Sequence, residues 1–335
     1  MTMAFPFEEW FHPVDLSQYP KHKPTDQTDV RLAALVHTTV EPGILADLKV
    51  LIFGVPQDIG IQRNGGRAGA SEGPAAIRHF LYRLTPFFYE SSLDHPDLHL
   101  ADLGDLNVEG LTLEEIHWRQ ERVVRAALEQ GWLPIVLGGG HDIAFPNGAA
   151  LGQHYDAIGI VNLDAHLDVR PLIDGQRAHS GSPFRQLLDH PDVFIPPGCL
   201  VEFGVQWFAN THSHWEFLRE EEMSIFWLQD IYRSGFVPAL ETAFRKARQG
   251  ADAVYVTFDL DGVRASDAPG VSAPSPVGFS AEDYCYAAYY LGAQEEVKLM
   301  DVAELNPRYD QDGRTAKLAA LVVAHFLAGV LRRLE

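Results

Sequence analysis

The chain has 335 residues, of which 46% are hydrophobic and 21% charged, a composition typical of a globular protein with one large α/β domain or two small ones. Its formal net charge of −20 disfavours binding to a nucleic-acid backbone or to an anionic membrane surface, so neither partner is expected. The sequence shows no apolar run of the ~18–20 residues that span a bilayer, no signal peptide, and only the cysteines Cys199 and Cys285, so we expect a cytoplasmic protein without a disulfide framework.

The chain is expected to form one domain in which strands and helices alternate. Residues 1–45, rich in proline and histidine, are expected to be an irregular N-terminal segment, and residues 46–335 a single domain, because no linker divides them. Helical spacing of apolar residues, with start and stop signals, predicts helices at 73–84, 114–130, 238–248 and 314–334. Apolar runs predict eight strands, at 48–55, 98–103, 132–137, 157–163, 199–205, 223–228, 253–258 and 297–302. This alternation is typical of a mostly parallel sheet that is covered by helices on both faces.

Polar side chains that can bind a metal follow several of these strands directly. Open parallel sheets bind ligands beyond the carboxyl ends of their strands, so a functional cluster should lie there. The strand at 157–163 leads into Asp164, His166 and Asp168, whose spacing lets the three side chains point the same way in an extended segment. By itself this pattern would equally suit a solvated loop. Other strands, however, lead into four further candidates, which are His141 after three glycines, Asp259, Asp261 and Glu304.

The chemistry of this set favours two metal ions rather than one. Four aspartates and two histidines exceed the three protein ligands that a catalytic zinc normally uses. Carboxylate-rich ligation with some imidazole suits Mn²⁺, and shared carboxylates suit two ions about 3.5–4 Å apart. Without such ions the clustered acids would repel one another, and several would have to stay protonated.

In these motifs and their order the sequence resembles the ureohydrolase superfamily of arginase, agmatinase and formimidoylglutamase, from about Val50 to the end of the chain. The resemblance implies a three-layer α/β/α sandwich on an eight-stranded, mostly parallel sheet, with 46–335 as an arginase-like catalytic domain. It also implies a homo-oligomer, a trimer or a hexamer. It further implies two Mn²⁺ ions, the first held by His141, Asp164, Asp168 and Asp259 and the second by Asp164, His166, Asp259 and Asp261, so that Asp164 and Asp259 bridge.

Within this superfamily the stretch after the Asp164–Asp168 block favours formimidoylglutamase. Arginases and agmatinases typically carry His-Gly-x-Pro there, with that histidine as a proton shuttle. Here Ser180 takes the position of the histidine, and His179, one residue earlier, is the remaining candidate for a shuttle. The sequences at 63–67, 138–142, 204–206 and 268–274 also resemble formimidoylglutamase.

The substrate implied by this resemblance, N-formimidoyl-L-glutamate, carries two carboxylates besides its amidine-like head. Arginine binds carboxylates bidentately, and a local basic rim would be needed in a chain of net charge −20. The candidate clamp consists of Arg63, Arg67, Arg170 and Arg185, with Asn64 and Ser180 as further polar contacts. The alternative is that these arginines simply pair with surface acids.

The expected reaction yields L-glutamate and formamide, a step of histidine degradation. Two Mn²⁺ ions would activate a water molecule, Glu304 would hold the amidinium-like nitrogens, and Asp168 would carry a proton to the glutamate nitrogen. One alternative is an agmatinase or another guanidino- or amidino-hydrolase, from which Ser180 differs. A one-zinc deacetylase of related fold is disfavoured by the additional His141 and Asp261. A catalytically inactive scaffold of the same fold is disfavoured because all six candidate ligands are present.

Overall fold

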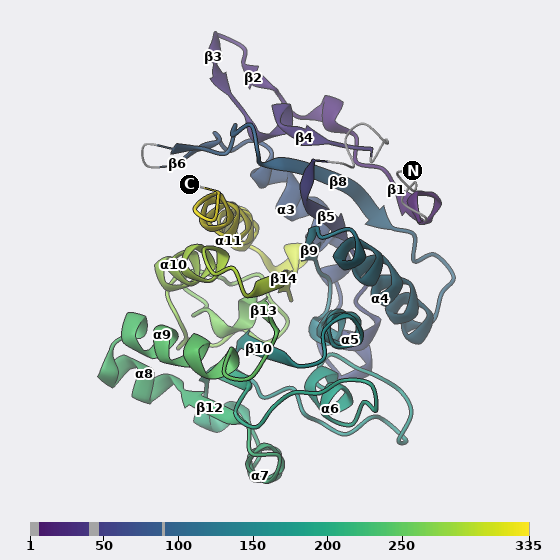
Figure 1. Ribbon diagram of the computed structural model, residues 1–335, viewed down its shortest axis with the longest axis vertical. Helices are drawn as coiled ribbons and strands as arrows, with labels where there is room; N and C mark the ends of the chain where they lie inside the picture. Colours follow the sequence, from purple (N-terminus) through teal and green to yellow (C-terminus); the bar gives the residue numbers. More distant parts are fainter. Residues whose placement is uncertain (1–6, 40–46, 89–90, 335) are drawn as a thin grey trace.

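The computed structural model describes residues 7–39, 47–88 and 91–334, and these form three layers around a central sheet (Figure 1). Eight strands run parallel to their neighbours, and each corresponds to one of the eight predicted strands. In spatial order they are β8 (His99–Leu106), β5 (Leu48–Gly54), β9 (Leu133–Leu137), β14 (Val297–Ala303), β13 (Ala253–Asp259), β10 (Ile158–Leu163), β11 (Leu200–Val205) and β12 (Ser224–Trp227).

The sheet has ten strands rather than the eight predicted, because the N-terminal segment contributes two. Antiparallel β1 (Phe11–His12) and parallel β4 (Val36–His37) both pair with β8, whose outer edge would otherwise be open. Strands of two residues carry no readable periodicity, which is why the sequence did not reveal them. The segment is also not wholly irregular, since β2 (His22–Lys23) and β3 (Asp26–Val30) pair with each other. A third small pairing joins β6 (Phe87–Phe88) to β7 (Ser91–Ser92).

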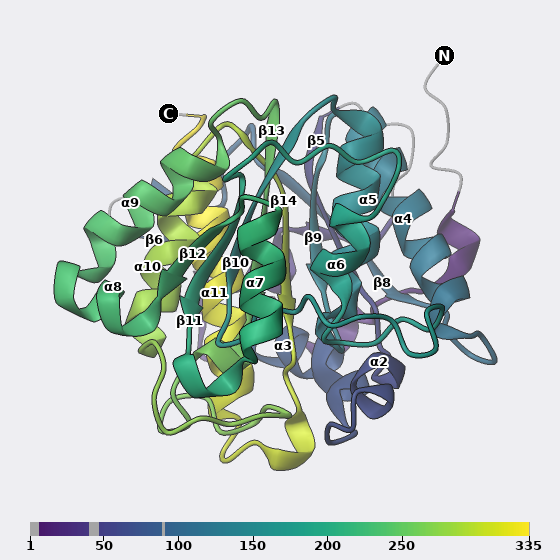
Figure 2. The same cartoon turned by 90° about the horizontal axis from the view of Figure 1, so that it is seen from below.

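Helices cover both faces of the sheet, which confirms the predicted α/β/α sandwich (Figure 2). One face packs against α3 (Gly73–Leu81), α8 (Leu228–Ser234), α9 (Phe236–Ala247), α10 (Ala281–Gly292) and α11 (Arg314–Leu331). The other packs against α4 (Leu113–Glu129), α5 (Ala144–His154), α6 (Pro183–Leu188) and α7 (His212–Glu220). Every residue of β9, β10 and β13 is buried, as expected of central strands between two helical layers.

One helix, α5, was not predicted from the sequence, and another, α11, has the composition of a membrane span. Helix α5 was not predicted, because it is buried on most sides between α4 and α6 and therefore has no polar face to set a period. Helix α11 has 18 residues and a mean hydropathy of 1.5, so it has the length and composition of a membrane span that the sequence was expected to lack. However, 72% of it is buried inside the protein, where it packs against α10 and α3 as a core helix does.

A buried ion pair ties α3 to β8. Arg78 donates from Nε to Asp102 Oδ2 at 2.7 Å and from Nη2 to Oδ1 at 3.0 Å, and both side chains are almost completely buried. Asp105 accepts from Nη1 of the same guanidinium, and Tyr82 donates to Asp102.

Removing one partner from this pair would leave a buried charge without its counterpart. We expect Asp102→Asn to lower the free energy of unfolding by about 3–5 kcal/mol in urea denaturation. Asp97→Asn, which changes an exposed carboxylate just before β8, is the matched control and should change it little. Equal losses in the two variants would contradict this account of the ion pair.

Candidate metal centre

The predicted metal ligands lie together at the carboxyl ends of three strands, β9, β13 and β10, in the middle of the sheet. β9 leads through three glycines to His141, and β10 leads to Asp164, His166 and Asp168. β13 ends at Asp259, and Asp261 follows in the short helix η7 (Leu260–Gly262). A side chain at Gly139 would place Cβ 1.7 Å from the Gln57 carbonyl oxygen, so only glycine lets the loop before His141 take this path.

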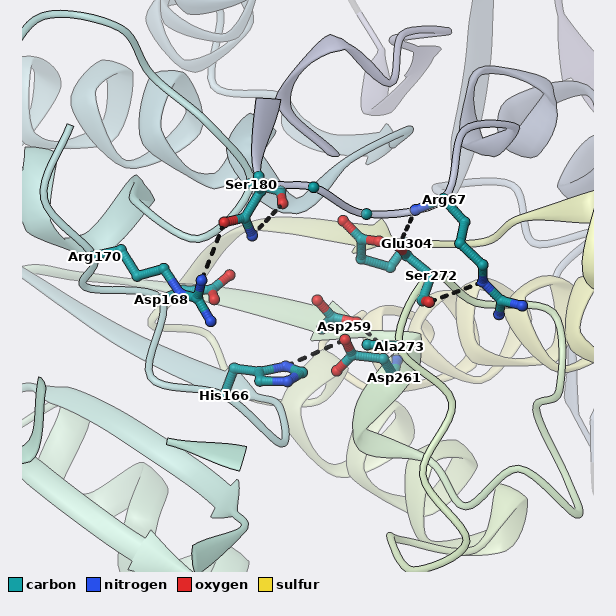
Figure 3. Close-up of a pocket in the computed structure, with 13 residues that line it drawn as sticks. Arg67, His166, Asp168, Arg170, Ser180, Asp259, Asp261, Ser272, Ala273 and Glu304 are labelled. Atoms are coloured by element: carbon teal, nitrogen blue, oxygen red, sulfur yellow. Dashed lines mark hydrogen bonds and ion pairs between the residues drawn. The ribbon is translucent and has the colours of Figure 1, made fainter. Parts of the chain in front are cut away.

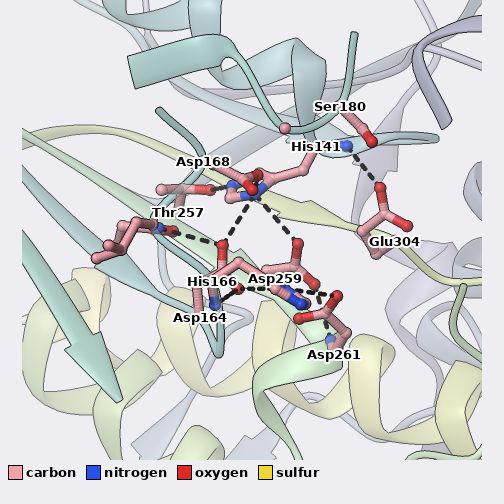
Figure 4. Close-up of polar contacts among 12 residues, drawn as sticks. His141, Asp164, His166, Asp168, Ser180, Thr257, Asp259, Asp261 and Glu304 are labelled. Carbon is pink, nitrogen blue, oxygen red and sulfur yellow. Dashed lines mark hydrogen bonds and ion pairs between the residues drawn. The ribbon is translucent and has the colours of Figure 1, made fainter. Parts of the chain in front are cut away.

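The His141 ring forms the first centre. Its Nδ1 lies 3.3 Å from Asp164 Oδ2, 3.0 Å from Asp168 Oδ2 and 3.1 Å from Asp259 Oδ2 (Figure 4). Three carboxylate oxygens and one imidazole nitrogen therefore point at a common volume, with all four atoms within 4.8 Å of one another. This is a donor set that suits Mn²⁺.

The His166 ring forms the second centre. Its Nδ1 lies 3.4 Å from Asp164 Oδ1 and 3.2 Å from Asp261 Oδ2. Asp164 thus offers one oxygen to each centre, which is the arrangement that a carboxylate bridging two ions requires. Asp259, which is expected to serve both ions, lies in the His141 group.

A buried hydrogen-bond chain fixes the His141 ring. Thr257 Oγ1 donates to the Asp301 carboxylate at 2.6 Å, so the same oxygen must accept from His141 Nε2, 2.9 Å away. Asp301 is itself held by Tyr255 and by Asn147 Nδ2. With its proton on Nε2, a neutral His141 presents the lone pair of Nδ1 to the three carboxylates, ready to bind a metal.

The pKa shifts within the cluster show how closely its charged groups are packed. Burial and the charges of Asp261 and Asp164 raise the pKa of Asp259 well above its usual range, and burial raises the pKa of Asp261 to about 6. For Asp164 the hydrogen bonds from the two histidines outweigh burial and lower the pKa. The charge of Asp259 and the hydrogen bonds to the aspartates outweigh burial to raise the pKa of His141. The surrounding acids therefore favour a proton on Nδ1 of His141.

Two residues of the site have a left-handed backbone. Asp168 has φ 44° and Glu304 has φ 67°, a conformation that non-glycine residues rarely adopt and that clusters at functional sites. The Glu304 amide donates to the Gly139 carbonyl at 2.8 Å, and its Oε1 accepts from the His141 amide at 3.0 Å. Burial and the charge of Asp261 raise the pKa of Glu304 well above its usual range. Glu304 is thus held against the loop that carries a metal ligand.

A cavity of about 290 Å³ opens over the cluster (Figure 3). Its lining comprises Asn64, Gly65, Gly66, Arg67, His166, Asp168, Arg170, Ser180, Asp259, Asp261, Ser272, Ala273 and Glu304. On one side Arg170 Nη1 donates to Asn64 Oδ1 at 3.4 Å, and Asn64 Nδ2 donates to Ser180 Oγ at 3.1 Å. Four of the predicted substrate contacts, Asn64, Arg67, Arg170 and Ser180, therefore do line the cavity above the cluster.

The guanidinium of Arg67 is largely committed to the protein. Its Nε donates to the Ser272 carbonyl at 3.0 Å and its Nη2 to the Val271 carbonyl at 2.5 Å. The same group stacks 3.8 Å from the centre of the Tyr309 ring. Arg67 therefore connects two loops at the rim, which leaves Arg170 as the more available cation.

Three predicted site residues are not brought to the cavity. Arg63 pairs with Glu114 and donates to the Ala178 carbonyl at 3.0 Å. Arg185 lies over the Phe217 ring at 3.4 Å. His179 Nε2 lies 3.1 Å from the Pro171 carbonyl and its Nδ1 accepts from the Gly181 amide at 3.2 Å, so its own loop occupies both ring nitrogens. The shuttle and clamp roles considered for these residues have no geometric support.

Some residues of the site were not singled out from the sequence. Ser272 and Ala273 line the cavity, and both lie in the 268–274 stretch that supported the family resemblance. Thr257 and Asp301 had a different signal, since each is a polar residue with apolar neighbours on both sides within a strand. A buried polar group needs a hydrogen-bond partner, so such positions indicate a network behind the ligands.

Comparison with known proteins gives consistent results. The sequence model of the Arginase family matches residues 48–329. Formimidoylglutamase of Ralstonia nicotianae is 37% identical over 84% of this chain and 85% of the relative, and that of Aeromonas hydrophila is 33% identical over 93% and 98%. Among solved structures, Trypanosoma cruzi formiminoglutamase with Mn²⁺ superposes with a TM-score of 0.79, at 36% identity, over 90% of this chain and 99% of the other.

Thr257→Val tests the chain of hydrogen bonds behind His141. The variant keeps the shape of the side chain but removes the acceptor for Nε2–H, so we expect the affinity for Mn²⁺ to fall about 10–100-fold. Competition with a chelator measures the affinity, and Thr242→Val on the exposed face of α9 is the matched control. Unchanged affinity in Thr257→Val would mean that Thr257 does not position the ring.

Metal binding should also depend on pH. Because the pKa of His141 is raised, Nδ1 holds a proton below that pKa, and a metal must displace it. Affinity for Mn²⁺ should therefore rise as the pH goes from about 6 to about 8, with net release of protons. Calorimetry in buffers of different ionisation enthalpy measures both quantities. Binding that neither changes with pH nor releases protons would show that the cluster is not charged as described.

Proposed function

This chain belongs to the arginase family, and we propose that it hydrolyses N-formimidoyl-L-glutamate to L-glutamate and formamide with two Mn²⁺ ions. The observation that carries the proposal is the pair of histidine–carboxylate centres sharing Asp164, directly beneath a cavity whose rim carries Arg170. The similar proteins from Ralstonia, Aeromonas and Trypanosoma are named for this activity, and the structure of the last was solved with Mn²⁺.

The six predicted ligands fit the two ions by chemistry and by direction. His141, Asp168 and Asp259 would hold the first, His166 and Asp261 the second, and Asp164 both. Bound there, the ions lower the pKa of a water molecule and so supply hydroxide at neutral pH.

The protein's own residues would orient the substrate and move the proton. Glu304 lines the cavity with one oxygen already bonded to the His141 amide, which leaves the other free to pair with the amidine-like nitrogens. Asp168, which belongs to the cluster and also lines the cavity, can take the proton that the water loses and pass it to the departing glutamate nitrogen. The C–N bond to that nitrogen breaks, and the formimidoyl carbon leaves as formamide.

The substrate's carboxylates would be recognised on the side of the cavity that carries Arg170. Arg170, Asn64 and Ser180 form one hydrogen-bonded set there, so a carboxylate would meet one cation and further donors. This local charge is what an anionic substrate needs in a protein of net charge −20. A cationic substrate such as agmatine would be repelled by the same group.

The assembly and location are part of the proposal. We propose a single catalytic domain over 46–335, a range that contains the whole family match at 48–329. We further propose that the protein is a cytoplasmic homo-oligomer of three or six chains. Light scattering of the purified protein measures the number of chains directly.

A panel of substrates tests the function. With Mn²⁺ present, formimidoyl-glutamate should be hydrolysed, whereas arginine, agmatine and guanidino acids should give little or no turnover. Turnover of agmatine or another guanidino compound alone would replace the proposed substrate within the family. A protein that binds Mn²⁺ but turns over none of them would support an inactive scaffold.

Arg170→Met tests carboxylate recognition. Loss of the cation should raise KM about tenfold, equivalent to about 1.4 kcal/mol, with kcat changed much less. The matched control is Arg177→Met, because the Arg177 side chain is exposed and pairs with Asp174 in the same turn. If Arg170→Met left KM unchanged, the substrate's carboxylates would bind elsewhere.

A further inference from the structure

A second cavity, of about 260 Å³, lies at the opposite end of the sheet from the metal cluster. Lys49 is the second residue of β5, Leu133 the first of β9 and Lys298 the second of β14. The cavity therefore lies where these parallel strands begin, whereas the metal ligands follow the ends of their strands. Helices α4 and α11, whose last turns reach the cavity, lie on opposite sides of the sheet (Figure 2).

Much of the cavity wall is apolar. Leu128 at the end of α4, Trp132 just before β9 and Val330 at the end of α11 line it. An apolar wall favours a ligand that removes it from water, at roughly 25 cal/mol per Å² of surface. A bare inorganic ion would leave this wall wet.

Three cations line the same cavity, and none of them forms an ion pair with a described residue. They are Lys49, Lys298 and Arg333. Three cations without an acidic partner in one cavity are unexpected in a chain with 46 acidic and 26 basic residues. The acids that influence Arg333 most are Glu295 and Glu296, and Glu296 is already paired with Arg248 at 2.6 Å.

Arg333 is incompletely satisfied. Its Nε donates to the Gly292 carbonyl at 2.6 Å and its Nη1 to the Val297 carbonyl at 3.0 Å, whereas Nη2 is buried without a hydrogen-bond partner among the described residues. Burial lowers the pKa of Arg333 to about 10, because two neutral carbonyls do not replace the water that its charge has lost. A buried donor without a partner is costly, and an anion at Nη2 would supply the acceptor.

We propose that this cavity binds a small organic carboxylate with an apolar body. The carboxylate accepts from Nη2 of Arg333 and lies close to Lys298 and Lys49. The apolar body packs against Trp132 and Val330. The volume is slightly below the usual range of ligand pockets, about 300–1,000 Å³, so the ligand is small.

The test uses hexanoate as the probe and the full-length, Mn²⁺-loaded protein in isothermal titration calorimetry. Hexanoate should bind about tenfold more tightly than acetate, because only hexanoate has a body that covers the apolar wall. Hexylammonium and inorganic phosphate should bind more weakly still. Acetate also measures how much of the binding comes from a carboxylate that coordinates the metal ions alone.

Two variants place the binding in this cavity. Lys298→Met and Arg333→Met should each weaken hexanoate binding at least about fivefold. Arg245→Met, an equal change of charge on the exposed face of α9, should not. Because Arg333 also holds two backbone carbonyls, its variant can lose stability. The side chain of Lys298 makes no hydrogen bond among the described residues, so Lys298→Met suffices alone.

The proposal is overturned by any of three results. Hexanoate fails to bind, or phosphate binds as tightly as hexanoate, or Lys298→Met leaves the hexanoate affinity unchanged. The last result would locate the binding elsewhere, including at the metal ions. Turnover should be the same in Lys298→Met as in the unchanged protein, which separates this site from the reaction.

Discussion

The repulsion among the four clustered aspartates is the constraint on which the rest of the structure depends. Acids this close and this buried cannot all stay ionised unless positive charge lies between them. The two imidazoles can supply part of that charge, with His141 facing three carboxylates and His166 facing two. A pair of divalent ions would supply it more completely, and would displace the protons that the histidines hold.

The surrounding fold keeps these groups in place. Parallel strands deliver the ligands to one edge, and the buried centre of the sheet holds the hydrogen-bonded groups behind them. Thr257 and Asp301, on neighbouring strands at matching register, fix the outer nitrogen of His141. The left-handed backbone at Asp168 and Glu304 turns both side chains toward the same cavity. The site therefore lies at one edge of the sheet, and the groups that hold it lie in the buried strands directly behind it.

The main strands and the metal ligands could be predicted from the sequence, and there is a physical reason why other features could not. The central strands could be predicted because burial on both faces makes them continuous apolar runs in the sequence. The six ligands could be predicted because parallel strands bring the residues that follow their carboxyl ends to one edge of the sheet. The direction of individual side chains near the cavity could not be predicted from the sequence, because it depends on the partners that the fold brings to each residue. Arg63 turned to Glu114, Arg185 to Phe217 and His179 to its own loop, while Arg170 faces the cavity.

The central claim is that six residues of this chain hold two ions with Asp164 between them. Anomalous diffraction at the manganese edge, from crystals of the Mn²⁺-loaded protein, tests it most directly. The account predicts two peaks, one beside His141 and Asp168 and the other beside His166 and Asp261, with an oxygen of Asp164 on each. A single peak, no peak, or ions bound away from these residues would contradict it.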